Sequence, residues 1–268
     1  MNAKLNQEEM KRYSRHIMIP EVGEDGQRKL KEASVLVVGV GGLGSPIALY
    51  LAAAGIGYIG MVDPDVVEES NLQRQVIHSM NWLGKPKVES AKEVMHSINP
   101  KVDINAINDR FTYKNAISIA EDFDILIDGT DNLASRYLLS DLSVFTGKPY
   151  VYGSIFQFEG QVSVFGYEHG PCYRCLFPKP PVPGSIPLSN EVGVFGVLPG
   201  VIGSLEATEA IKLILGIGNT LSGKLLLLDA LDMSFQLIAV DKNPKCEVCG
   251  IDPKIDALID YDAFCETI

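Results

Sequence analysis

The sequence predicts an α/β fold: a Rossmann-like, doubly wound, mostly parallel sheet with an antiparallel C-terminal extension. The first indication is an apolar strand pattern at 34–40 that runs into a glycine loop and then an apolar helix pattern at 47–56. The second is the alternation of strand and helix patterns up to Gly147, which is typical of parallel sheets with crossover helices. The third is the segment 159–167, where apolar and polar residues alternate as in antiparallel strands.

The elements are expected in a simple order. A helical stretch covers 6–30 and is interrupted around 19–23, where Pro20 and Gly23 disfavour a helix. The parallel half then consists of strands at 34–40, 58–62, 102–108 and 123–128, with helices at 47–56, 87–97 and 116–120. Later elements are short strands at 150–152, 159–167 and 224–228, a proline-rich loop at 179–183 and a helix at 201–215. We therefore expect an N-terminal helical segment (1–30), one large α/β domain (31–250) and a tail (251–268).

Composition and charge exclude several classes of protein. The 268 residues, 46% of them hydrophobic, are enough to bury a full core. A net charge of −11 argues against a nucleic-acid partner, because no basic stripe is available to neutralise phosphates. The polar N-terminus does not resemble a signal peptide, and no stretch approaches the roughly 18 apolar residues of a membrane span. We expect a cytoplasmic protein that does not enter a membrane.

The glycine loop predicts a nucleotide site. Gly39, Gly41 and Gly44 have the GxGxxG spacing, and Gly42 adds a fourth glycine. Such a loop lets the backbone approach a phosphate, and the next helix points its N–H groups at the anion. Asp63 follows at roughly the 20-residue spacing at which an acidic residue binds a ribose hydroxyl. NAD, FAD and ATP binders share these features; a tight turn without ligand, or an Asp63 that only caps a turn, is the plainer interpretation.

Polar residues further along favour nucleotidyl transfer over hydride transfer. Arg74 and Lys87 are cations that can hold a triphosphate, although each alone reads as a surface charge. Asp131 and Asn132 follow a buried strand, at the sheet edge where ligands of open α/β sheets bind. A carboxylate at that edge suits Mg²⁺, which prefers one or two carboxylates together with phosphate oxygens.

These segments resemble the MoeB/ThiF/HesA family, the bacterial relatives of ubiquitin-activating enzymes. The resemblance rests on the glycine loop, the stretch from Ser70 to Gln75, the start of the helix at Lys87 and the triplet 130–132. It implies a homodimer that uses ATP and Mg²⁺ to adenylate the C-terminal Gly-Gly carboxylate of a ubiquitin-fold sulfur-carrier protein. The residues implied to hold the nucleotide are Gly39, Gly41, Gly42, Asp63, Ser70, Asn71, Leu72, Gln73, Arg74, Lys87, Asp131 and Asn132.

The resemblance also assigns catalytic roles. It implies that Gly42 and Asp63 hold adenosine and ribose, and that Asn71, Arg74 and Lys87 contact phosphates. It also implies that Asp131 handles magnesium and is the residue most needed for adenylation. Arg15 stands where the family has an arginine that reaches into the ATP site of the other subunit. Without the resemblance, Arg15 reads as a surface charge on a helix.

The cysteines predict a structural zinc site. Cys172 and Cys175 form one CxxC pair, and Cys246 and Cys249 form a second. Two such pairs in a cytoplasmic protein fit a closed tetrahedral Zn²⁺ site better than disulfides. Cys265 is left over, and we expect no role for it.

One position departs from the family. Ser189 occupies the place where many members have a loop cysteine, and a hydroxyl lacks the nucleophilicity of a thiolate. We therefore expect adenylation without a covalent enzyme–carrier bond, and sulfur from an external rhodanese or cysteine desulfurase. The tail at 256–265 resembles the linker that leads into a rhodanese domain in fused members, a domain we do not expect here. An ordinary disordered terminus explains the tail equally well.

Two other activities stay open. An NAD(P)-dependent oxidoreductase would use the same loop, but it leaves Arg74, Lys87 and Asp131 unexplained. A relative that adenylates a peptide or a tRNA-linked carboxylate would keep all of them. The intact set of charged residues disfavours an inactive scaffold, and the motifs do not choose among molybdopterin, thiamin, tRNA-thiolation, cysteine and secondary-metabolite pathways.

Overall fold

The computed structural model describes residues 4–181 and 193–266 and contains an eight-stranded sheet in the order β3-β2-β1-β4-β5-β6-β7-β8. Strands β3 to β5 are parallel to one another, and β5 to β8 are antiparallel. The predicted fold class is thereby confirmed. The strands are β1 (Ser34–Val38), β2 (Tyr58–Val62), β3 (Asp103–Ile107), β4 (Ile125–Asp128), β5 (Tyr150–Phe156), β6 (Glu159–Phe165), β7 (Lys224–Asp229) and β8 (Ser234–Ala239).

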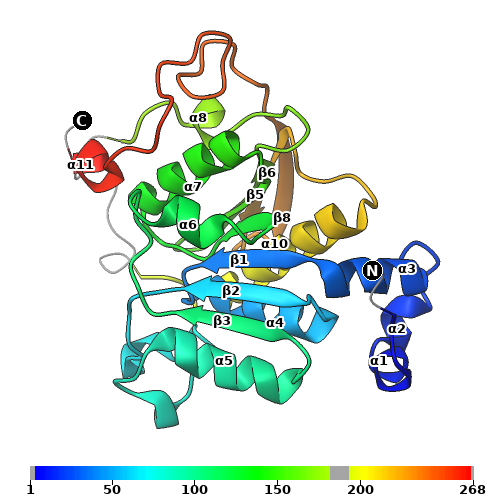
Figure 1. The fold of residues 1–268 in the computed structure, drawn as a ribbon. Helices are drawn as coiled ribbons and strands as arrows, with labels where there is room; N and C mark the ends of the chain where they lie inside the picture. The colour runs from blue at the N-terminus through cyan, green and yellow to red at the C-terminus, as the bar shows by residue number, and fades with distance from the viewer. Residues whose placement is uncertain (1–3, 182–192, 267–268) are drawn as a thin grey trace.

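Helices cover both faces of the parallel half (Figure 1). Side chains of β1 show the division, since Val35 and Val37 pack with α4, α5 and α10, whereas Leu36 and Val38 pack with α6 and α7. The helices are α1 (Gln7–Arg12), α2 (Ser14–Ile17), α3 (Gly23–Glu32), α4 (Gly44–Ala54), α5 (Lys87–Ile98), α6 (Ala116–Ala120), α7 (Leu133–Thr146), α8 (Tyr173–Leu176), α10 (Leu198–Leu215) and α11 (Tyr261–Glu266). Among the residues that the structure describes, no helix combines the length and apolarity needed to cross a bilayer.

The N-terminal helical stretch differs from its prediction by a second interruption, at Tyr13. Its ring is buried, its hydroxyl accepts a hydrogen bond from Asn99 Nδ2 at 2.8 Å, and it packs where a side chain on Gly55 would otherwise lie. Tertiary packing of one aromatic ring thus separates α1 from α2. The strand expected at 34–40 ends at Val38, because Gly39 has a φ of +90° and begins the loop.

Candidate active site and four-cysteine cluster

A cavity of about 380 Å³ opens at the carboxyl ends of β1, β2 and β4. This is the edge where the strand order reverses between β1 and β4, the usual ligand position in such sheets. The structure brings the following predicted residues to its wall: Gly39, Gly41, Gly42, Asp63, Arg74, Lys87, Asp131 and Asn132. Most of the predicted nucleotide set therefore shares one cavity.

The glycine loop is shaped by close backbone contacts. A side chain on Gly39 would put its Cβ 2.6 Å from the carbonyl oxygen of Gly129, and one on Gly44 would lie 2.1 Å from that of Gly39. Only glycine fits at these two positions. The loop leads directly into α4, so the N-terminal amides of that helix lie beside the cavity wall formed by Gly41 and Gly42.

Both backbone polar groups of Val40 are hydrogen-bonded to side chains. Asp63 Oδ2 accepts a hydrogen bond from Val40 N at 2.7 Å, and its Oδ1 accepts one from Asp65 N at 2.9 Å. His78 Nε2 donates to Val40 O at 2.9 Å, and burial lowers the pKa of His78, which favours the neutral ring. Asp63 therefore supports the loop while its carboxylate also lines the cavity, where its remaining lone pairs can accept from a ligand.

Two predicted cations face the cavity. Lys87 is largely buried at the start of α5, and its Nζ lies 2.7 Å from Asp65 Oδ2. The side chain of Asp65 is 63% exposed, so water can solvate its carboxylate when Lys87 binds a phosphate instead. Arg74 follows the turn at Glu69–Asn71, and its Nη1 donates to Ser70 O at 3.3 Å. Both cations suit an anionic ligand.

The residues before Arg74 form a tight turn. Ser70, Asn71, Leu72 and Gln73 are not among the described residues that line the cavity. Their turn fixes Arg74, whose backbone N–H donates to Asn71 O at 3.1 Å. The stretch from Ser70 to Gln73 therefore forms a turn that positions Arg74 at the cavity wall.

Asp131 and Asn132 have different surroundings. Asn132 caps α7, since its Oδ1 accepts from Ser135 N at 2.9 Å. Asp131 is exposed to the cavity, so its carboxylate is accessible to a cation there. Of the two, Asp131 is the better metal ligand.

Arg15 lies away from this cavity. It is exposed on α2, and it is absent from the described lining residues. In Figure 1, α1, α2 and α3 lie at the amino ends of the strands, on the edge opposite the cavity. Arg15 therefore does not complete the site of its own chain.

Arg136 is a functional candidate that sequence reasoning missed. It lines the cavity from the first turn of α7, and its Nε lies 3.9 Å from Oδ2 of the fully buried Asp128. Asp128 also accepts from Tyr150 OH at 2.6 Å and from Thr130 Oγ1 at 2.7 Å, and burial raises its pKa. The i, i+4 spacing from Asn132 is the signal that places Arg136 on the cavity side once α7 is recognised.

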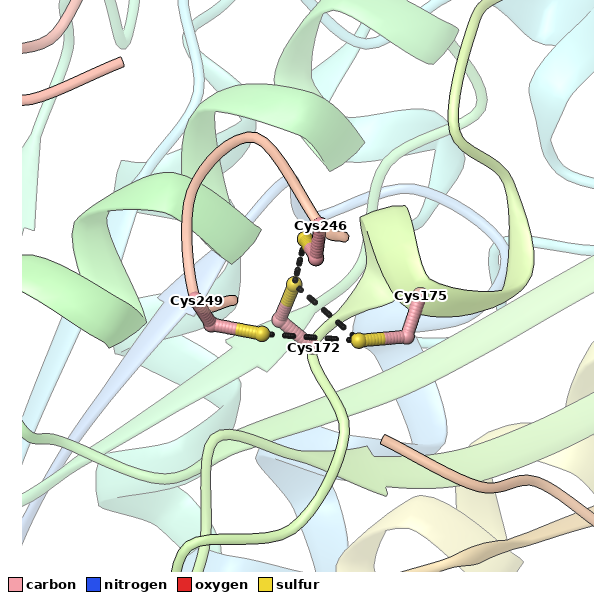
Figure 2. Close-up of side chains that lie close together, drawn as sticks. All are labelled: Cys172, Cys175, Cys246 and Cys249. Atoms are coloured by element: carbon pink, nitrogen blue, oxygen red, sulfur yellow. Dashed lines mark hydrogen bonds between the residues drawn. The ribbon is translucent and has the colours of Figure 1, made fainter. Parts of the chain in front are cut away.

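The four cysteines converge as predicted (Figure 2). Cys172 Sγ lies 3.9 Å from Cys175 Sγ and 3.5 Å from Cys246 Sγ, and Cys175 Sγ lies 3.4 Å from Cys249 Sγ. Disulfides require about 2.05 Å, whereas four sulfurs around Zn²⁺ with 2.3 Å bonds are about 3.8 Å apart. The donor set fits a closed tetrahedral zinc site.

The structure gives little support for a role of Ser189 or Cys265. Ser189 lies outside the described residues. Cys265 is half-buried in α11, and burial raises its pKa, so its thiol is less reactive than a free one.

Comparisons with known proteins agree with this geometry. The model of the ThiF family matches residues 13–248. The chain is 51% identical over 263 residues to "Sulfur carrier protein adenylyltransferase" of Thermus thermophilus, covering 96% of this chain and 97% of that protein. It is 50% identical over 269 residues to "Probable adenylyltransferase/sulfurtransferase MoeZ" of Mycobacterium tuberculosis, covering 98% and 67%. It is 46% identical over 262 residues to "SAMP-activating enzyme E1" of Haloferax volcanii, covering 98% and 96%.

A solved structure shares the fold. Escherichia coli MccB, crystallised with ATP, superposes with a TM-score of 0.79 at 23% identity, covering 93% of this chain and 75% of that one. This similarity supports the arrangement of strands and helices.

Proposed function

Because the chain belongs to the ThiF family, we propose that it catalyses ATP-dependent adenylation of the C-terminal Gly-Gly carboxylate of a ubiquitin-fold sulfur-carrier protein. The observation that carries this proposal is the near full-length similarity to a sulfur carrier protein adenylyltransferase, at 51% identity. The cavity supports it, because it gathers a glycine loop, a helix N-terminus, two cations and an accessible carboxylate.

The proposed chemistry is nucleotidyl transfer. A carboxylate oxygen of the carrier attacks the α-phosphorus of ATP, the bond to the β-phosphate oxygen breaks, and pyrophosphate leaves. Arg74 and Lys87 stabilise the charge that develops on the phosphates, and Asp63 binds the ribose. Mg²⁺, when bound at Asp131, would neutralise phosphate charge. Gly41 and Gly42 let the backbone approach the phosphates.

The thiocarboxylate then forms without a covalent bond between this enzyme and the carrier. Sulfide attacks the acyl carbon of the adenylate, and AMP leaves, which gives the thiocarboxylate directly. The persulfide of an external rhodanese or cysteine desulfurase instead gives an acyl disulfide as AMP leaves, and a second thiol of the donor then cleaves its S–S bond, releasing the thiocarboxylate and leaving a disulfide on the donor. Ser189 is a weak nucleophile compared with a thiolate, which supports this direct route. We assign adenylation to residues 31–250 of a homodimer, with the segment 1–30 as an arm that carries Arg15 to the partner subunit. Reduced cysteines and a zinc site suit the cytoplasm.

ATP–pyrophosphate exchange tests the proposal. The wild-type protein should catalyse exchange only with a carrier that ends in Gly-Gly, and removal of those two glycines should abolish it. Asp131→Ala should lower the rate by about 100-fold or more, the usual loss for a group that stabilises transition-state charge. Asp122→Ala, which removes an exposed aspartate outside the cavity, is the matched control and should keep the rate.

Three results would contradict the proposal. Exchange that requires a short peptide or a tRNA instead of a carrier would favour the alternative substrate class. Reduction of NAD⁺ without exchange would indicate an oxidoreductase. Normal exchange by a folded Asp131→Ala protein would remove Asp131 from the chemistry.

A further inference from the structure

Arg110 is a cation at the rim of the nucleotide cavity that no motif assigns. It follows β3, and it lines both the main cavity and a neighbouring one of about 200 Å³. Phe111 lines the same two cavities and is 7% exposed. Together with Ser135, which also lines both cavities, these two side chains form the boundary between them.

The guanidinium of Arg110 is paired with the C-terminal helix. Arg110 Nη2 lies 2.8 Å from Asp262 Oδ1, and the two side chains are 66% and 52% exposed. An ion pair this exposed contributes little to the free energy of unfolding. Its consequence is geometric, because it selects one direction for a long, flexible side chain that otherwise samples many.

α11 is itself fixed by buried contacts, although it is short. Tyr261 OH donates to Asp141 Oδ2 at 2.7 Å, and Arg174 makes a two-point ion pair with the same carboxylate at 2.9 Å. Phe264 packs edge-on against Tyr137 of α7. α11 thus lies against α7 (Figure 1), and Asp262 is presented to Arg110 from a defined position.

Strand order indicates which end of a nucleotide lies near Arg110. The glycine loop follows β1, Asp63 follows β2, and Arg110 follows β3, in the spatial order β1-β2-β3. In this fold the phosphates lie at the glycine loop and the ribose at the acidic residue after β2. The base then extends toward β3, where Phe111 offers a ring and Arg110 a planar cation that stacks on aromatic faces.

We propose that Arg110 contacts the base of the bound nucleotide and that Asp262 of the C-terminal helix positions it there. This inference rests on the proposed function, since it assumes that ATP occupies the cavity. It makes the C-terminal segment part of the nucleotide site.

Calorimetric titration of three ligands tests the contact with the base. Arg110→Ala should weaken the binding of ATP and of adenosine by the same factor, about tenfold. The affinity for inorganic tripolyphosphate should be unchanged. Lys114→Ala is the matched control, because Lys114 lines only the neighbouring cavity among the described residues, and it should bind all three ligands as the wild type does. Equal losses for ATP and tripolyphosphate would show a phosphate contact instead and overturn the inference.

A double-mutant cycle tests the role of Asp262. Asp262→Asn should raise the KM for ATP about threefold at unchanged kcat, and it should have no further effect in the Arg110→Ala background, because Asp262 acts only through Arg110. Asp256→Asn, an exposed aspartate of the same tail, is the control. Additive losses, or no loss, overturn the positioning role. If wild-type protein fails to bind ATP at all, the proposed function fails, which is a separate outcome.

Discussion

Glu206 is a carboxyl group buried without a hydrogen-bond partner. It is 0% exposed, and neither of its carboxyl oxygens is hydrogen-bonded among the described residues. A Cβ on Gly153 would lie only 2.2 Å from the Glu206 carboxyl carbon, so the glycine of β5 leaves the space that this group fills. Complete burial raises the pKa of Glu206 well above its ordinary 4.5, and the charge of Asp128 raises it further. We infer that Glu206 is held in the neutral form.

This neutral carboxyl predicts a pH-dependent stability. Because the pKa of Glu206 is higher in the folded than in the unfolded chain, its contribution is complete below pH 4.5 and is lost as pH rises toward the folded pKa. The loss is at most about 1.4 kcal/mol per pH unit. Glu206→Gln keeps a neutral group of similar size, so the variant should gain stability relative to the wild type as pH rises from about 5 to 9. Urea unfolding across this range measures the difference.

The control for this measurement is Glu21→Gln, which changes an exposed carboxyl. Its stability difference from the wild type should stay constant with pH. If the difference between wild type and Glu206→Gln is equally flat, Glu206 is ionised in the folded protein and another group compensates its charge.

At the scale of the elements, the sequence predicted the parallel half well and the rest less completely. The strand, glycine loop and helix from β1 to α4 carry local signals that tertiary packing does not override. The sequence pattern does not predict α7, because Asn132, the N-cap of this helix, is assigned to the ligand site alone. β8 was missed because it is an edge strand with mostly exposed side chains and no alternation. α8 and α11 are too short to show periodicity.

The same division applies to the site. Asp63 and Asp131 were predictable because each follows a parallel strand, and such positions meet at one edge of the sheet. Lys87 opens a helix at that edge. Arg110 was not predictable, because no local pattern marks it and only the path of the loop after β3 brings it to the cavity. Arg136 depends on α7, since its i, i+4 spacing from Asn132 has meaning only once that helix is recognised.

The cysteine cluster connects distant elements and predicts a dependence on metal. It joins α8 to the segment after β8, and Arg174 between its first two cysteines holds Asp141 of α7. Purified protein should carry about one zinc ion per chain, as a four-thiolate site requires. Cys249→Ser should lose most of this metal and lower the melting temperature, because the three remaining sulfurs then crowd together without a cation.

Elemental analysis and thermal unfolding check this prediction, with Cys265→Ser as the matched control outside the cluster. The control should keep both metal and melting temperature. Full stability of a zinc-free wild-type protein would show that thiol packing alone suffices.

At the scale of the whole molecule, charge is distributed unevenly. The chain has a net charge of −11, yet four cations line one cavity: Arg74, Lys87, Arg110 and Arg136. The overall charge favours solubility and disfavours nucleic acid, whereas the local cations attract a polyanion at one point. Arg15 of the N-terminal arm, which we expect to act on the nucleotide, is not among the described residues that line the cavity of its own chain.

Arg15 therefore predicts a shared active site. It lies at the edge of the sheet opposite the cavity of its own chain, so a catalytic role requires a second subunit whose cavity it can reach. Arg15→Ala should lower pyrophosphate exchange by about 100-fold or more, as loss of an arginine supplied in trans does. A dimer formed from one Arg15→Ala chain and one Asp131→Ala chain contains one site in which both groups are native.

Mixing the two inactive variants measures this directly. When the subunits have fully redistributed, half of the dimers are mixed, and each mixed dimer has one competent site. ATP–pyrophosphate exchange should therefore recover to about a quarter of the wild-type rate. Mixing Asp131→Ala with the double variant Arg15→Ala/Asp131→Ala is the control and should recover nothing, because no combination restores Asp131. If mixed dimers form, as mass spectrometry of differently labelled chains can establish, and activity stays absent, then Arg15 has no role in the partner's site.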